Sequence, residues 1–138
     1  MSFQSSYDAS QKDVNVSEML GLTLTEVRVE NEDEIYFTTQ EGREFVMYHE
    51  NNCCERVSID EIEGEWSNLI GLPLLLAEEV SSEGVASRWS GSEDESFTWT
   101  FYKLATNRGT VVIRWYGTSN GYYSESVDFR EINIKAVN

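Results

Sequence analysis

An alternation of side-chain types along residues 97–104 constrains the fold more than any other stretch of this chain. Aromatic residues occupy every second position, so Phe97, Trp99 and Phe101 fall on one face of an extended strand. The opposite face carries Thr98, Thr100 and Tyr102. A period of two is typical of a β-strand and excludes a helix over these residues.

Tight turns connect this strand to two more predicted strands. Asn107-Arg108-Gly109 is a hairpin turn that leads into a strand over residues 110–116. Asn120-Gly121 supplies the positive φ of a second tight hairpin, followed by a strand over residues 122–129. Three strands linked in this way predict an antiparallel sheet.

Other segments rich in β-branched and apolar residues predict further strands. They lie at residues 22–29, 34–39, 43–49 and 74–80. The first three form a meander, and the apolar phase of the first shifts near Thr25-Glu26, which indicates a bulge. Ile132 and Ile134 continue an edge strand or tail.

One segment, residues 60–70, shows the spacing of a helix. Apolar residues recur at intervals of three and four, at Ile59, Ile62, Trp66, Leu69 and Ile70. Ser58 and Glu61 match a capping box, and Gly71 and Pro73 stop the helix. The predicted fold is therefore α+β, a mostly antiparallel sheet with one short helix packed on it.

The 138 residues suit one domain. Residues 1–16 lack an apolar period and are expected to form a flexible arm, with a single α+β domain over residues 17–138. Residues 81–95 are rich in Ser, Gly and Glu and are expected to form an exposed loop, in which Trp89 is a lid or a contact point.

The net charge of −15 comes from 25 acidic and 10 basic residues. A field of this sign repels nucleic acid and anionic membranes and favours basic partners or cations. No apolar run reaches the ~18 residues that would span a bilayer, and the N-terminus lacks the pattern of a secretory signal, so we expect a cytoplasmic protein. The charge serves either solubility alone or imitation of a phosphate backbone.

The acidic residues gather in short clusters, none with the spacing of a calcium loop. The candidate acidic surface comprises Glu32, Asp33, Glu34, Glu61, Glu63, Glu65, Glu93, Asp94 and Glu95.

The only histidine and both cysteines lie within residues 49–54. His49, Cys53 and Cys54, with Glu50 or Glu55, offer ligands for a zinc ion, although neighbouring cysteines seldom face one ion. A nucleophilic cysteine activated by His49 is an alternative, opposed by the surrounding acids. The third reading is structural, with one cysteine packed inside and His49 hydrogen-bonded at a strand end. We expect no cofactor, with zinc at His49, Cys53 and Cys54 as the alternative.

Residues 114–125 are dense in aromatic, amide and hydroxyl groups, which suit a recognition surface. The candidate binding residues here are Arg114, Trp115, Tyr116, Asn120, Tyr122, Tyr123 and Glu125, together with His49, Cys53, Cys54 and Glu55. Arg114 is expected to pair with Glu125 across the hairpin. The plainer alternative is an aromatic sheet face with one structural ion pair.

Two stretches carry a resemblance to a known family. Residues 48–59 hold a Tyr-His-x-x-x-Cys-Cys-Glu core, and residues 114–125 an Arg-Trp-Tyr-Gly-x-Ser-Asn-Gly-Tyr-Tyr-Ser-Glu hairpin. Together with residues 96–103 they resemble a family of small acidic proteins of unknown function from bacteriophages and bacterial genomes, over roughly residues 18–129. The family often has an acid where this chain has Asn52, which weakens a metal site there. The resemblance implies a phage or prophage context but no reaction.

Three functions remain open from the sequence. The leading hypothesis is a phage-type inhibitor of a bacterial defence system, such as a CRISPR or restriction complex. It would bind a host nucleic-acid-handling protein through acidic surface and aromatic anchors, without binding nucleic acid or membrane itself, and either as a monomer or as a homodimer. The second is a small-ligand binder that sequesters a nucleotide signal between residues 49–55 and residues 114–125. The third is a metal- or cysteine-dependent enzyme, which the sequence favours least.

Overall fold

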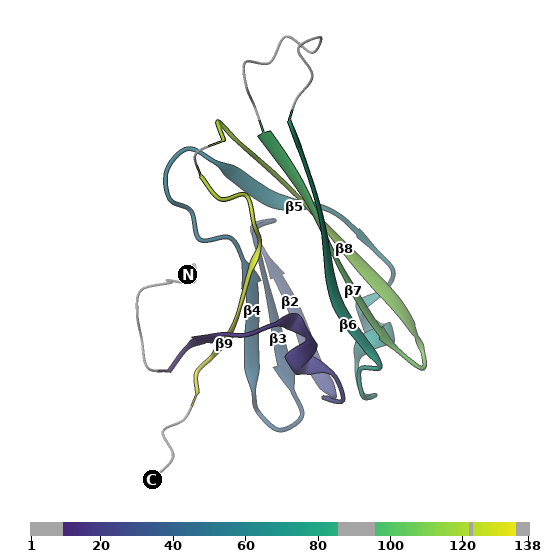
Figure 1. Cartoon of the computed structure of the whole chain (residues 1–138). Coiled ribbons are helices and arrows are strands. Elements are labelled where there is room, and N and C mark those ends of the chain that lie inside the picture. The colour runs from purple at the N-terminus through teal and green to yellow at the C-terminus, as the bar shows by residue number, and fades with distance from the viewer. Residues whose placement is uncertain (1–9, 86–95, 122, 135–138) are drawn as a thin grey trace.

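The computed structural model describes residues 10–85, 96–121 and 123–134. Its elements, in chain order, are β1 (Lys12–Asp13), η1 (Val16–Met19), β2 (Leu24–Glu30), β3 (Glu34–Thr39), β4 (Glu44–Tyr48), β5 (Arg56–Glu63), η2 (Trp66–Leu69), β6 (Leu76–Val85), β7 (Ser96–Thr106), β8 (Gly109–Ser119) and β9 (Asp128–Ile132). The strands form two antiparallel sheets that pack face to face (Figure 1). One sheet, the meander sheet, has the order β1-β9-β4-β3-β2, and the other, the hairpin sheet, has the order β5-β8-β7-β6.

The α+β prediction is wrong, because the described residues form strands and two 3-10 turns but no α-helix. The expected helix over residues 60–70 is instead the end of β5 followed by η2. A bulge between Ile59 and Glu61 inserts one extra residue into β5. Ile59 and Ile62 therefore both pack against the core although they are three positions apart, which imitates helical spacing.

Gly64 ends β5 in a backbone conformation that suits glycine, with φ of 104°. A Cβ atom at this position would lie 2.5 Å from the carbonyl oxygen of Thr110. This close approach lets the chain turn directly from β5 into η2 beside the start of β8.

The chain leaves the hairpin sheet after Ser119, so the predicted strand over residues 122–129 is also wrong. It crosses to the other sheet, where β9 pairs with β4 and β1. Within this segment Glu125, Val127 and Phe129 are buried, and Val127 and Phe129 belong to the core. Of the described residues in the predicted strand, only Asp128 and Phe129 lie in a strand, and that strand belongs to the other sheet.

Most predicted strands are confirmed. The meander β2-β3-β4 forms with its bulge between Leu24 and Glu26, and β7 and β8 form the central hairpin. The strand expected at residues 74–80 is β6, which extends to Val85. The loop predicted over residues 81–95 is therefore wrong at residues 81–85, which are strand, and its remainder with Trp89 lies outside the described residues. The segment expected to be an N-terminal arm contains β1, which pairs with β9.

No helix in the described part of the chain is long and apolar enough to cross a membrane.

The core lies between the two sheets and is continuous. Its buried members are Val16, Met19, Leu24, Ile35, Phe37, Phe45, Met47, Val57, Leu69, Leu74, Ala77, Tyr102, Leu104, Val111, Ile113, Trp115, Val127 and Phe129. The inner faces of β6 and β7 are apolar only at one end, where Ala77 lies opposite Leu104. Toward the other end of these strands the inward residues become polar, and the candidate sites lie there.

Candidate functional site

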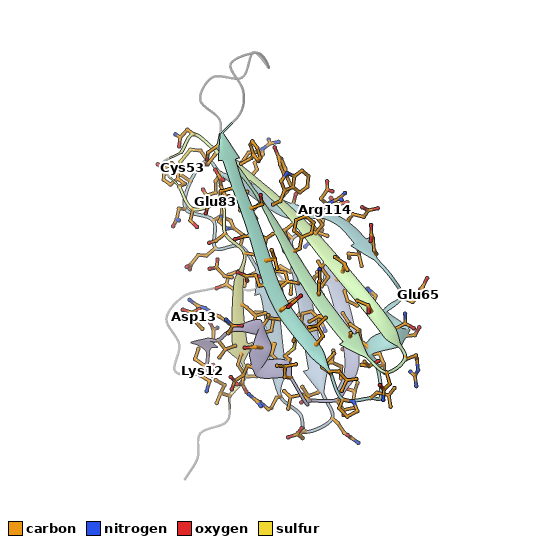
Figure 2. All side chains as sticks on the ribbon, turned by 45° about the vertical axis from the view of Figure 1, so that its right-hand side comes forward. Lys12, Asp13, Cys53, Glu65, Glu83 and Arg114 are labelled. Atoms are coloured by element: carbon orange, nitrogen blue, oxygen red, sulfur yellow. A yellow bond between two sulfur atoms is a disulfide. The ribbon has the colours of Figure 1, made fainter. Side chains whose placement is uncertain are left out.

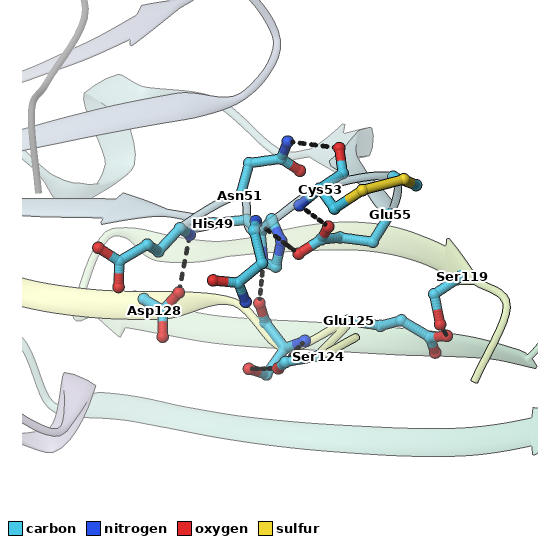
Figure 3. A network of polar contacts seen from close by, with 12 residues as sticks. His49, Asn51, Cys53, Glu55, Ser119, Ser124, Glu125 and Asp128 are labelled. Atoms are coloured by element: carbon cyan, nitrogen blue, oxygen red, sulfur yellow. Dashed lines mark hydrogen bonds and ion pairs between the residues drawn. A yellow bond between two sulfur atoms is a disulfide. The ribbon is translucent and has the colours of Figure 1, made fainter. Parts of the chain in front are cut away.

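The connection from β4 to β5, residues 49–55, is built around the buried carboxylate of Glu55 (Figure 3). Its oxygens accept hydrogen bonds from the backbone N–H groups of Asn52 and Cys53, each at 2.9 Å. The side chain of His49 contacts the same carboxylate, with 3.0 Å between Nε2 and Oε2. We call this segment the His49–Glu55 turn.

The other ring nitrogen of His49 joins the turn to the segment that precedes β9. Nδ1 lies 2.7 Å from the carbonyl oxygen of Ser126. Both partners of the ring, this carbonyl and the Glu55 carboxylate, are hydrogen-bond acceptors, so both contacts are satisfied only when both ring nitrogens carry a hydrogen. The His49 side chain is 4% exposed and the Glu55 side chain 0%, so the two form a buried pair.

Burial alone would raise the pKa of Glu55. The backbone N–H groups of Asn52, Cys53 and Glu55 itself, together with His49, outweigh burial and lower this pKa from 4.5 to about 2. Nearby, burial raises the pKa of Asp128, although the N–H of Glu50 and the charge of His49 act in the opposite direction. The turn is therefore organised around one ionised carboxylate.

The two cysteines form a disulfide between adjacent residues, and both are exposed. The expectation that one of them packs in the core is therefore wrong. The sulfurs are bonded to each other and both His49 nitrogens contact oxygen acceptors, and no group of three or more metal-ligating side chains gathers among the described residues. Zinc at His49, Cys53 and Cys54 stays an untested prediction. The same contacts leave no thiol and imidazole arranged as nucleophile and base.

Glu125 occupies a second buried polar site close to the first (Figure 3). Thr98 donates to Oε1 at 2.8 Å, and the hydroxyls of Ser96 and Ser119 donate to Oε2. The predicted ion pair between Glu125 and Arg114 is therefore wrong, since Glu125 faces the interior. Gly117 permits this approach, because a Cβ there would lie 2.9 Å from the Glu125 carbonyl oxygen.

A cleft of about 470 Å³ opens beside Glu125, between β6, β7 and the segment after β8. Its lining residues are Glu79, Ser81, Glu83, Ser96, Phe97, Thr98, Thr100, Gly121, Tyr123, Ser124, Glu125, Ser126 and Val127. Thr98, Thr100, Glu125 and Val127 are the buried residues among them. Of the ligand site expected between the His49–Glu55 turn and residues 114–125, this cleft contains Gly121, Tyr123, Ser124 and Glu125, but neither Arg114 nor any residue of the turn.

Arg114 lies on the outer face of the hairpin sheet (Figure 2). Its guanidinium contacts Asp60 at 2.6 Å and Glu61 at 2.9 Å, and it lies 5.3 Å from the centre of the Trp99 ring. Its pKa is raised, first by the hydrogen bond to Asp60. Trp115, the next residue, points inward and is fully buried, where its indole N–H contacts the sulfur of Met47 at 3.3 Å.

Aromatic side chains form a row beside Arg114. The rings of Trp99 and Tyr116 lie 4.4 Å apart and those of Phe97 and Tyr116 6.4 Å apart. We define the aromatic face as Phe97, Trp99 and Phe101 of β7, Tyr116 of β8 and Val80 of β6. The four rings are half-buried and Val80 is 49% exposed.

The expected acidic surface is present only in part. Glu61, Glu63 and Glu65 are exposed at and after the end of β5. Glu34 is buried and therefore does not belong to the surface, whereas Glu32 and Asp33 are exposed beside it. Asn120 is exposed, and Tyr123 is half-buried in the cleft wall. Glu93, Asp94, Glu95 and Tyr122 lie outside the described residues.

Sequence reasoning missed several residues of these sites. Trp99 and Phe101 were assigned to one strand face without a role, and Asp60 was assigned to a helix. Thr98 and Ser96 were not connected with Glu125. The alternation along β7 carried a usable signal, because threonine at two successive inward positions is unusual for a core strand.

Comparisons with known proteins give a family but no function. A family model described as a domain of unknown function (DUF7448) matches residues 17–129. The match begins within η1 and ends within β9, so it spans most of both sheets. No curated protein and no solved structure matches the chain. The resemblance to an uncharacterised family is thereby confirmed, while its phage or bacterial context stays a prediction.

Proposed function

Because the chain belongs to the DUF7448 family, a domain of unknown function, we propose its role from the geometry. It is a non-catalytic binding protein that engages a basic, nucleic-acid-handling protein through the aromatic face of the hairpin sheet and the acids beside it. The observation that carries this proposal is an incompletely covered aromatic row flanked by ion-paired carboxylates.

The aromatic face has the composition of a protein-recognition surface. Tyrosine, tryptophan and arginine supply most binding energy in protein interfaces, because they bring large contact area and fixed hydrogen-bond geometry. Trp99 contacts both Tyr116 and Arg114 here, so these side chains would enter an interface already ordered. Such preorganisation lowers the entropic cost of binding.

Charge favours a basic partner. Asp60 and Glu61 flank the aromatic face at β5, and Glu78 is exposed on its β6 side. The whole chain carries a charge of −15, so approach of a basic surface is steered from a distance. Proteins that hold DNA or RNA present such surfaces to phosphates. In a phage context, the partner would be a host defence nuclease.

The test begins with capture and ends with competition. Immobilised protein is incubated with bacterial lysate at low salt, and captured proteins are eluted with salt, identified and purified. The chain is then titrated into the DNA-binding assay of each purified partner. We expect competition with DNA, and an affinity that falls steeply with ionic strength.

Two aromatic variants on different sheets provide the matched comparison. Trp99→Ala should weaken partner binding on the order of tenfold or more, as for a hot-spot residue. Tyr36→Ala is the control, because Tyr36 also stacks with an arginine, Arg28 at 4.5 Å, but lies on the meander sheet. Equal losses for both variants would contradict the assignment to the aromatic face. Captured partners that do not bind nucleic acid, or that bind it undisturbed by the chain, would overturn the proposed mimicry.

A further inference from the structure

The cleft beside Glu125 is polar at a place where a sandwich ordinarily packs apolar side chains. Along the paired strands β6 and β7, the inward residues change from Ala77 and Leu104 to Ser81 and Thr100. The volume of about 470 Å³ falls within the range of small-molecule sites. Packing alone does not account for this change, since polar groups at a core position stabilise a fold less than apolar ones do.

The charge of the cleft selects the kind of ligand. Three carboxylates, those of Glu79, Glu83 and Glu125, line it, and its described lining contains no lysine, arginine or histidine. Of these, Glu83 has no hydrogen-bond or ion-pair partner among the described residues. A nucleotide or another anion would meet only repulsion and hydroxyl groups here, so the nucleotide signal expected from the sequence does not suit this cleft.

The carboxylates are arranged around the cleft and do not converge on one point. Glu79 and Glu83 lie four positions apart in β6, which places their Cα atoms roughly 13 Å apart. Both oxygens of Glu125 already accept hydrogen bonds from neighbouring hydroxyls. Within the described ranges no three acids lie close enough to hold one metal ion. Separate positive charges on one flexible molecule fit this spacing better than a single ion.

Glu79 also has a polar neighbour on the adjacent strand, β7. Tyr102 lies opposite Glu79 in the β6–β7 register and is fully buried. Burial, and then the Glu79 carboxylate, raise the pKa of Tyr102, so its hydroxyl stays protonated, although the contact does not meet the geometry of a hydrogen bond. Glu79 itself is exposed at the cleft, so its carboxylate is open to an ammonium group.

We propose that this cleft binds a linear polyamine, with one ammonium group at Glu79, another at Glu83 and the intervening chain along the cleft. The hydroxyl of Ser81, which lies between the two acids on the same face of β6, accepts a further hydrogen bond. Methylene groups of the ligand pack against Phe97 and Val127, the apolar members of the lining. Phe97 belongs to both this cleft and the aromatic face, whereas Trp99, Phe101, Tyr116 and Val80 do not line the cleft.

Titration calorimetry with spermidine at physiological salt tests the proposal. Wild-type protein should bind one spermidine per chain, and the double variant Glu79→Gln/Glu83→Gln should lose on the order of tenfold or more in affinity. Glu78→Gln is the matched control, because Glu78 adjoins Glu79 in β6 but points to the outer face. It should change spermidine affinity by less than about twofold, a difference typical of an exposed site.

Other ligands and variants define the outcomes that would overturn the proposal. Butylamine, with one ammonium group, should bind far more weakly than spermidine, and equal affinity would contradict recognition of separated charges. Magnesium that competes with spermidine at equal concentration would indicate a diffuse cation atmosphere. Equal losses of spermidine affinity in Glu78→Gln and in Glu83→Gln would likewise indicate a diffuse cation atmosphere. Trp99→Ala should leave spermidine affinity unchanged, so the failure of this site and the failure of the aromatic face can be told apart.

Discussion

The two ends of the sandwich interior are built from different materials. At one end the buried residues include the apolar Leu74, Leu104 and Val111. At the other end they include the polar Thr98, Thr100 and Glu125. The first end obtains its stability from the burial of apolar surface. The second needs a partner for every polar group, and it supplies those partners from segments distant in sequence. The contrast separates the part of the interior that holds the fold from the part that is open to a ligand.

The largest effect is expected from breaking the apolar interior. Trp115→Ala should lower the free energy of unfolding by about 4 kcal/mol, because it removes the largest fully buried side chain. Urea denaturation followed by circular dichroism measures this. Tyr116→Ala, one residue away on the half-exposed face, should cost only about 1 kcal/mol. Equal costs, or a larger cost for Tyr116→Ala, would contradict the inward and outward assignments of β8.

A smaller but substantial effect is expected at the His49–Glu55 turn. His49→Ala leaves the buried Glu55 carboxylate without its ring partner and should cost about 3 kcal/mol in the free energy of unfolding. Combining it with Glu55→Gln should cost less than the sum of the two single variants, since the second change removes the charge that the first left unpaired. Additive costs would show that the two side chains do not interact.

The same carboxylate predicts a pH dependence. The pKa of Glu55 is about 2 in the folded chain against an ordinary 4.5, so its contribution is complete above about 4.5 and is lost as the pH falls toward 2. The free energy of unfolding of Glu55→Gln, measured by urea titration across this interval, should therefore fall less steeply than that of the wild type. Glu65→Gln, an exposed carboxylate without a side-chain cap bond, should retain the steep fall. A wild-type slope in Glu55→Gln would contradict the assignment.

The smallest effect is expected in the cleft. Glu83→Gln should change the free energy of unfolding by no more than about 0.5 kcal/mol, because the side chain is exposed and has no partner among the described residues. Thermal unfolding without ligand measures this. A large loss in the free energy of unfolding would give Glu83 a structural role. It would contradict the assignment of the cleft end to ligand binding.

Local patterns in the sequence predicted individual strands well. The alternation along β7 and the phase shift in β2 are properties of neighbouring residues, and both appear as expected. The hairpin turn at residues 107–109 was also predicted correctly, since it joins β7 to β8. Where the pattern contained a bulge, at Ile59–Glu61, the same reasoning failed, because one inserted residue converts strand spacing into apparent helical spacing.

Local patterns in the sequence could not predict which strands pair when those strands are distant in the chain. Val127 and Phe129 alternate in the same way whether their strand pairs with β8 or with β4, so the alternation cannot identify the sheet. The same error hid the ion pair between Arg114 and Asp60, because the predicted hairpin had placed Glu125 opposite Arg114. The clustering of His49 with Glu55 was close to correct, because the two residues are near in sequence.

The edge strands of both sheets share one further consequence. The short β1 offers only two residues for pairing, β2 and β5 each carry a bulge, and β6 exposes Glu78, Glu79 and Glu83 along its length. Each of these features hinders the addition of a strand from another molecule, which is the first step of edge-to-edge aggregation. The same acids that could attract a partner thus keep copies of the chain from joining sheet to sheet. These features favour a sheet face over a sheet edge as the interface of any homodimer.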